Sequence, residues 1–217
     1  MSQLLETVER VTGDQPDGAV IWLHGLGADG NDFVPIVPEL GLKNLRFVFP
    51  HAPVRPVTLN NGMAMRAWFD IRDLTRETLP DREGLDQTAA EVTRLIQREN
   101  ERGIDSSKIV IAGFSQGGAA ALYTALPYAE KLAGIIGLST WIPVRDNAGS
   151  VNSQTPIFLG HGNSDPIVNI SAGIATRDAL VEQGYDVVWN TYPMEHAVCP
   201  QEINDVAAFL HRVLPRG

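Results

Sequence analysis

The sequence predicts an α/β protein in which helices cover both faces of a mostly parallel central sheet. Short apolar runs rich in β-branched residues recur along the chain, as expected for buried strands, at residues 19–23, 45–49, 108–112, 132–138, 156–159 and 186–192. Segments with helical spacing of apolar residues lie between several of these runs. Alternation of strands and helices predicts a parallel sheet, because parallel neighbours need a crossover that a helix can supply.

The helical spacing is clearest in three segments. They carry apolar residues at Leu85, Ala89, Val92, Leu95 and Ile96, then along residues 170–181, and finally at Ile203, Val206, Ala207, Leu210 and Leu214. Each pattern gathers apolar side chains on one helix face, which we expect the sheet to cover.

Residues 51–80 form the one long stretch without a clear period. Prolines interrupt it, and it contains Met63, Met65, Trp68 and Phe69. Such stretches are usually functional or disordered, and the aromatic and sulfur content here favours packing. No repeat, low-complexity tract or linker marks a boundary, so we expect residues 1–217 to form one domain without a large lid domain.

Composition restricts the partners of the chain. Its 26 acidic and 17 basic residues give a formal net charge of −9, which repels nucleic acid and anionic membrane surfaces. The single cysteine, Cys199, cannot form an internal disulfide, which favours a reducing compartment. No run approaches the roughly 18 apolar residues of a membrane span. We therefore expect a cytoplasmic protein with no nucleic-acid partner and no stable membrane insertion.

A candidate nucleophile follows one of the predicted strands. Residues 108–112 run into Gly113-Phe114-Ser115-Gln116-Gly117, and the helix-prone residues 119–122 come next. A G-x-S-x-G motif between a strand and a helix is typical of a nucleophile elbow, in which small residues let the chain double back around a strained serine. A glycine-rich turn with a capping serine, or a phosphate-binding turn, is the non-catalytic alternative, although the lysine of a phosphate-binding loop is missing.

A serine needs a base and an acid, which follow it along the chain in this kind of site. The histidines after Ser115 are His161, His196 and His211, and His211 falls in the terminal helical segment. His196, in the loop after the last strand, is our candidate base. Asp165 lies in the turn just beyond the predicted strand at residues 156–159 and is the candidate orienting acid. A turn aspartate before proline also occurs without catalysis.

Acyl transfer also creates an oxyanion that two N–H groups should stabilise. One should be the backbone N–H of Gln116, directly after the nucleophile. The other should come from Leu26, in the glycine-rich turn at residues 24–27 that ends an early strand. A plain strand-ending turn is the alternative for the second position.

These motifs resemble the phospholipase/carboxylesterase family of the α/β-hydrolase fold, which contains carboxylesterases, lysophospholipases and acyl-protein thioesterases. The resemblance covers nearly the whole chain and rests on residues 24–27 (HGLG), 68–70 (WFD), 113–118 (GFSQGG), 138–139 (LS), 161–166 (HGNSDP) and 192–196 (YPMEH). It implies the triad Ser115, Asp165 and His196, the donors Leu26 and Gln116, no metal or organic cofactor, and hydrolysis of acyl esters or thioesters. It also implies that residues 68–70 lie near the site, and it allows a homodimer.

The main functional expectation is a serine carboxylesterase that hydrolyses short- to medium-chain esters, because no lid is expected to enclose a long chain. An acyl-protein thioesterase or a lysophospholipase is the alternative within the family. Candidate substrate-binding residues, each of which can equally belong to the core, are Gly25, Met65, Trp68, Phe69, Trp141 and Ile142.

Other classes of function stay open at this point. A metal-dependent hydrolase would draw its ligands from His24, His161, Asp165 and His196, without a dense ligand motif. A noncatalytic protein that binds a small hydrophobic ligand would use the same pocket. Cys199 is a weak candidate nucleophile, because it lies too near His196 in sequence for this fold.

Glu195 departs from the family pattern, in which glycine commonly precedes the catalytic histidine. A carboxylate beside His196 would favour the protonated imidazole and move the onset of activity to higher pH.

Overall fold

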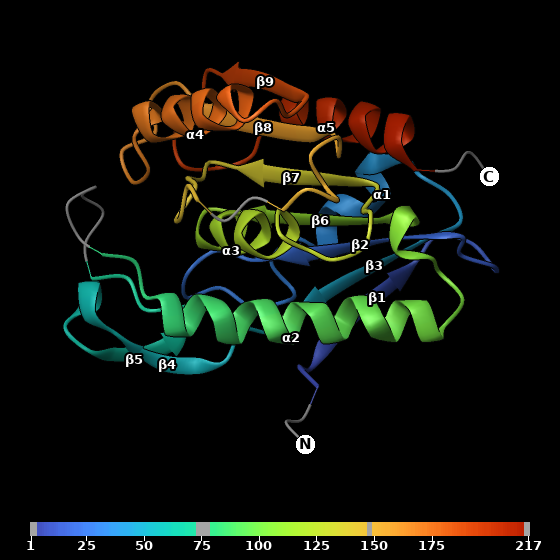
Figure 1. Ribbon diagram of the computed structural model, residues 1–217, viewed down its shortest axis with the longest axis horizontal. Helices are drawn as coiled ribbons and strands as arrows, with labels where there is room; N and C mark the ends of the chain where they lie inside the picture. The colour runs from blue at the N-terminus through green and yellow to red at the C-terminus, as the bar shows by residue number, and fades with distance from the viewer. Residues whose placement is uncertain (1–3, 73–78, 147–148, 215–217) are drawn as a thin grey trace.

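The computed structural model describes residues 4–72, 79–146 and 149–214. A seven-stranded sheet runs through the centre in the order β1-β3-β2-β6-β7-β8-β9 (Figure 1). The strands are β1 (Thr7–Val11), β2 (Gly18–Leu23), β3 (Leu45–Pro50), β6 (Ile109–Phe114), β7 (Gly134–Leu138), β8 (Ile157–Gly162) and β9 (Val187–Tyr192). All neighbours are parallel except β1, which pairs antiparallel with β3 at one edge. The predicted α/β class is confirmed, and β1 is an additional strand.

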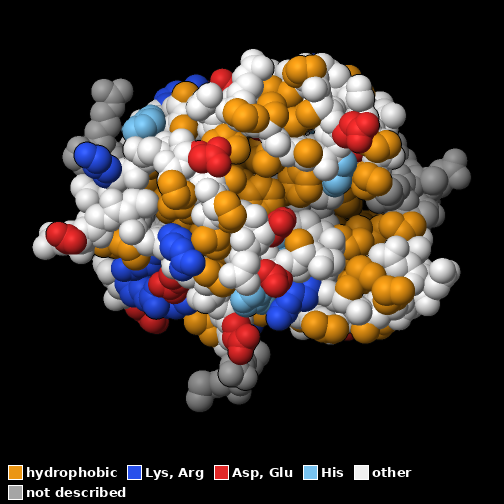
Figure 2. Space-filling model, turned by 180° about the vertical axis from the view of Figure 1, so that it is seen from behind, with side chains coloured by type: hydrophobic (Ala, Val, Ile, Leu, Met, Phe, Trp, Pro, Cys, Tyr) orange, Lys and Arg blue, Asp and Glu red, His pale blue; other side chains and the backbone are white. Residues whose placement is uncertain are grey.

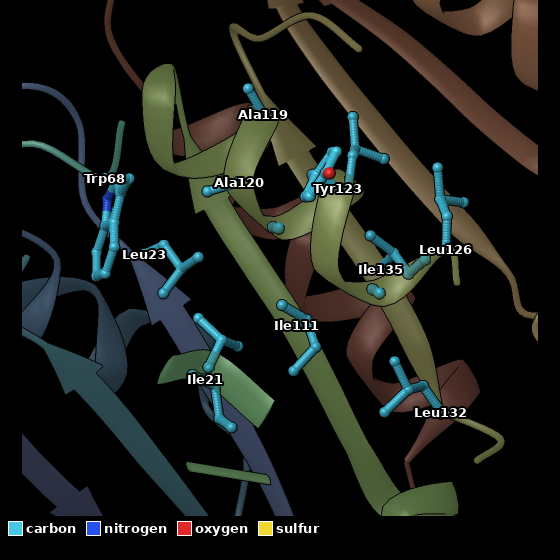
Figure 3. Close-up of a cluster of buried hydrophobic side chains, with 14 of the residues drawn as sticks. Ile21, Leu23, Trp68, Ile111, Ala119, Ala120, Tyr123, Leu126, Leu132 and Ile135 are labelled. Carbon is cyan, nitrogen blue, oxygen red and sulfur yellow. The ribbon is translucent and has the colours of Figure 1, made fainter. Parts of the chain in front are cut away.

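Helices cover both faces of this sheet. On one face lie α2 (Arg82–Glu101), α3 (Gln116–Ala125) and α4 (Ile170–Glu182), and on the other lie the short α1 (Val37–Leu40) and α5 (Pro200–Val213) (Figure 1). Strand residues alternate between the two resulting cores, so Ile21 and Leu23 belong to the first and Val20 and Trp22 to the second. Figure 3 shows the first core, where side chains of β2, β6 and β7 pack beneath Ala120 and Tyr123 of α3.

The helix ends follow from local chemistry. The side chain of Asp81 accepts a hydrogen bond from the N–H of Gly84 and so caps α2. This helix is followed by Gly103 at φ 92°, a backbone conformation that favours glycine. Pro200 occupies the first turn of α5, where no N–H partner is needed.

Residues 51–80, expected to lack regular structure, contain an antiparallel hairpin. Its strands are β4 (Val54–Val57) and β5 (Met63–Arg66), joined through the 3-10 turn η2 (Thr58–Asn60) and the left-handed residues Asn61 and Gly62. Our expectation was therefore wrong for this part, because an Asn-Gly pair is a hairpin signal even without alternating apolar residues. Residues 73–78 of the same stretch lie outside the described residues.

The surface carries mixed charge. On the face seen in Figure 2, acidic and basic side chains are interspersed among apolar ones. Part of this charge is paired, because Arg98 and Arg102 contact Glu9 at 2.9 and 3.0 Å. Within the described residues, no helix is both long enough and apolar enough to cross a membrane.

Candidate active site

Ser115 lies at the tight turn between β6 and α3. Its backbone has φ 54° and ψ −121°, a combination that side chains rarely adopt. Two hydrogen bonds hold it there: the Ser115 N–H donates to the Leu138 carbonyl at 2.8 Å, and the Thr140 hydroxyl donates to the Ser115 carbonyl at 2.7 Å. The turn thus presents the Ser115 hydroxyl at the carboxyl end of the central strands, where ligands bind in open parallel sheets.

The flanking glycines are required by close packing. A Cβ on Gly113 would lie 2.2 Å from the carbonyl oxygen of Gly117, and one on Gly117 would lie 2.2 Å from the carbonyl oxygen of Leu23. No larger residue fits at either position without moving backbone. The first turn of α3 therefore lies directly against the end of β2.

His196 lies on the loop after β9 and reaches both other candidate residues. Its Nε2 is 3.0 Å from the Ser115 hydroxyl oxygen, and its Nδ1 is 2.7 Å from Oδ2 of Asp165. Because an ionised carboxylate only accepts, Nδ1 carries the proton and Nε2 is left to accept the serine proton. The Phe114 ring packs against the imidazole, with the two ring centroids 4.8 Å apart.

Asp165 is buried and uses its two oxygens differently. Oδ1 accepts from the backbone N–H groups of Ile167 and Val168, both at 2.9 Å. These bonds fix the carboxylate in the turn after β8 and leave Oδ2 facing His196. The arrangement can orient a histidine and stabilise its protonated form during proton transfer.

His161 stands behind this acid rather than beside the serine. It is 1% exposed, and its Nε2 lies 2.8 Å from the Val168 carbonyl and 3.6 Å from Oδ2 of Asp165. Burial lowers the pKa of His161, so the neutral ring donates Nε2–H to that carbonyl. Its role in supporting the Asp165 turn was not anticipated from the sequence.

The two expected oxyanion donors come from different segments, the first turn of α3 and the turn after β2. The N–H of Gln116 belongs to the first turn of α3, where backbone donors have no partner within the helix. In the turn after β2, the N–H groups of Gly27 and Ala28 donate to Arg66 and Gly25 carbonyls, whereas that of Leu26 donates to nothing in the described part of the chain. Gly25 itself lies against the serine: a Cβ there would be 3.7 Å from the Ser115 Cβ.

Both ring nitrogens of His24 contact backbone groups. Its Nδ1 lies 2.7 Å from the Gly25 carbonyl, and its Nε2 accepts from the Ala52 N–H at 3.1 Å. Burial lowers its pKa to about 4, so the ring is neutral at pH 7. With both nitrogens in use, it is poorly suited to be a metal ligand. Among residues 4–72, 79–146 and 149–214, no group of three or more His, Cys, Asp or Glu side chains could hold a metal ion.

The expected substrate-binding residues fall into two groups. Trp68 has no exposed surface and Phe69 is buried, so the structure places Trp68 as a support behind the site. Met65, Trp141 and Ile142 are half-buried. Phe69 packs edge-on against Trp141 with ring centroids 6.3 Å apart, which joins residues from two distant loops. Cys199, at the N-cap of α5, is half-buried.

Comparison with known proteins extends these observations. Residues 7–214 match the family described as Phospholipase/Carboxylesterase. The acyl-protein thioesterase 1 of Cryptococcus neoformans var. neoformans serotype D is 39% identical, covering 90% of this chain and 92% of that protein. The acyl-protein thioesterase 1 of Mycosarcoma maydis is 38% identical over 94% of each.

Two solved structures superpose closely on this chain. Arabidopsis thaliana SOBER1 superposes with a TM-score of 0.86 at 31% identity, covering 91% of this chain and 99% of that one. Zea mays acyl-protein thioesterase 2 gives a TM-score of 0.86 at 30% identity, covering 97% and 99%. With this fold and family match, the chain is a serine hydrolase that acts on ester bonds. It belongs to the phospholipase/carboxylesterase family of the α/β-hydrolase fold.

Proposed function

We propose that this protein is an acyl thioesterase of the acyl-protein thioesterase kind, with Ser115 as nucleophile, His196 as general base and Asp165 as the residue that orients the base. The observation that carries the proposal is the continuous line of contacts from Ser115 Oγ through His196 to Asp165, at 3.0 and 2.7 Å. The relatives named above favour a thioester over the simple carboxylic ester that we first expected.

The first half of the reaction acylates the serine. Ser115 Oγ attacks the thioester carbonyl carbon while its proton passes to His196 Nε2. The carbonyl oxygen becomes an oxyanion between the N–H groups of Leu26 and Gln116. Collapse of the tetrahedral intermediate breaks the carbon–sulfur bond, and the leaving thiolate takes the proton from His196.

The second half hydrolyses the acyl-enzyme. A water molecule gives its proton to His196 Nε2 and attacks the same carbonyl carbon, again forming an oxyanion at the two donors. Collapse breaks the bond to Ser115, whose oxygen recovers the proton from His196. The products are a carboxylic acid and the free enzyme, so the cycle needs water but no redox partner.

The test compares matched thioesters and oxygen esters that share one acyl group, over increasing chain lengths. We expect a higher kcat/KM for the thioester, and we expect Ser115→Ala to lose nearly all activity, by about 10³-fold or more. Ser107→Ala is the matched control, because Ser107 is exposed in the turn before β6, at the opposite end of the strand from Ser115. This control should keep full activity.

Each outcome has a consequence for the proposal. A higher kcat/KM for the oxygen ester would restore the carboxylesterase assignment and leave the nucleophile unchanged. Full activity in Ser115→Ala would reject the serine mechanism itself. Tight binding of an acyl compound without turnover would instead favour a hydrophobic-ligand-binding protein.

A further inference from the structure

Residues 66–69, here called the bridging segment, lie against the turn that carries Leu26. The Gly27 N–H donates to the Arg66 carbonyl at 2.9 Å, and the indole Nε1–H of Trp68 donates to the His24 carbonyl at 2.8 Å. Leu26 stands between His24 and Gly27 in the chain. The bridging segment therefore holds the backbone on both sides of the second expected oxyanion donor.

The same segment is tied to the residue that supplies the first donor. The Gln116 side chain accepts the backbone N–H of Trp68 at 3.0 Å and donates its amide N–H to the Phe69 carbonyl at 2.7 Å. Gln116 has no exposed surface, so no water competes for these bonds. One buried side chain thus joins the start of α3 to the bridging segment.

Trp68 is the residue common to both connections. The hydroxyl of Thr88 in α2 donates to its carbonyl, and its ring packs 5.1 Å from the His24 ring. Every polar backbone or ring group of Trp68 therefore has a partner, and the side chain has no surface for a substrate to touch. Its hydrogen bonds lead to the two segments that carry the expected donors.

We propose that Trp68 is a positioning residue that sets the spacing of the oxyanion hole, holding the Leu26 turn with its indole N–H and the Gln116 end of α3 with its backbone N–H. The inference rests on the proposed function. Donors aimed in advance at the oxyanion contribute most when they need no rearrangement during the reaction. A displacement of about 1 Å at such a position can cost about 10²-fold in rate.

The test replaces the indole while keeping an aromatic ring. Trp68→Phe removes the hydrogen bond to His24, and we expect kcat to fall about tenfold while KM changes less than about twofold. Trp22→Phe is the matched control: Trp22 is a buried tryptophan of β2 in the core on the opposite face of the sheet, only 1% exposed, and its Nε1 has no partner among the described residues. It should lose similar packing without changing kcat.

A second measurement separates positioning from general loosening. A trifluoromethyl ketone adds to the serine and places an oxyanion in the hole, whereas a nonreacting ketone of the same length only fills the pocket. For Trp68→Phe we expect the inhibition constant of the first to rise in proportion to the fall in kcat, and that of the second to stay constant. Gln116→Met, which keeps the backbone donor but loses both side-chain bonds, should behave in the same way.

The outcomes that overturn the inference are distinct from those that overturn the proposed function. Equal losses of kcat in Trp68→Phe and Trp22→Phe would reject it, as would a change confined to KM. If Trp68→Phe fails to fold, an unchanged kcat in Gln116→Met rejects it instead. In all these cases Ser115→Ala would still be inactive, whereas an active Ser115→Ala would reject the proposed function first.

Discussion

Gly162 lies directly beneath the peptide that precedes His196: a Cβ at this position would be 2.3 Å from the carbonyl oxygen of Glu195. Gly162 ends β8, three residues before Asp165, so this contact sets how closely the loop carrying His196 approaches the turn carrying Asp165. Its φ is not in the left-handed region, so the requirement for glycine here is one of space and not of backbone conformation. The separation of Asp165 and His196 thus depends on the absence of a methyl group at Gly162.

Gly162→Ala should therefore impair catalysis by pushing the Glu195 peptide away. We expect kcat/KM to fall at least tenfold with a lowered Tm, because backbone and not a flexible side chain has to move. Gly184→Ala is the control: Gly184 has φ 87° and open space around its Cβ position, so alanine adds strain of roughly 1–2 kcal/mol without touching the site. Equal kcat/KM in the two variants would show that the contact does not position His196.

The carboxylate of Asp165 gives a second prediction. Asp165→Asn keeps the size of the side chain but can present N–H groups to His196, which would favour the wrong tautomer. We expect kcat to fall by about 10³- to 10⁴-fold, with KM little changed. Asp178→Asn, an exposed change on α4 where the carboxylate pairs with Arg177, should keep full activity in the same assay.

Most of the fold was predictable because most strands of the central sheet are buried on both faces. Central strands such as β2 are apolar along their whole length, and such runs are visible in a sequence. The edge strand β1, which pairs with β3, is partly exposed and carries Glu9 and Arg10. Its sequence therefore lacks the continuous apolar run that predicts a buried strand. The hairpin of β4 and β5 was missed for the same reason, since half of its strand residues are exposed.

Residue type and chain order were enough to select Ser115, Asp165 and His196 as candidates, and the structure places these three side chains in contact. The supporting contacts were not predictable. A tryptophan that lines a pocket and one that braces a turn look the same in a sequence, and only the burial of Trp68 separates these roles. The amide of Gln116 could have been noticed, because a glutamine inside an otherwise apolar and small motif needs buried partners.

Glu202, in the first turn of α5, supports a prediction about stability. Its side chain is fully buried at a small apolar cavity lined by Trp22, Leu138 and Val206, and both carboxyl oxygens lack partners in the described part of the chain. Burial, with the nearby charge of Asp205 adding to it, raises the pKa of Glu202 from 4.5 to about 8. The folded protein therefore holds a proton that the unfolded chain releases above pH 4.5.

The sign of the effect follows from this difference in bound protons. Between pH 4.5 and about 8 the native state binds more protons than the unfolded state, so the free energy of unfolding falls as pH rises, by ~1.4 kcal/mol per pH unit from this group. Glu202→Gln should abolish that slope, and its stabilising effect relative to the parent should grow toward pH 8. Urea unfolding at several pH values measures the slope of the unfolding free energy against pH for the parent and for Glu202→Gln. Glu182→Gln, a change at an exposed residue, is the control. Parallel slopes for Glu202→Gln and the parent would mean that Glu202 is ionised, with a partner, in the folded protein.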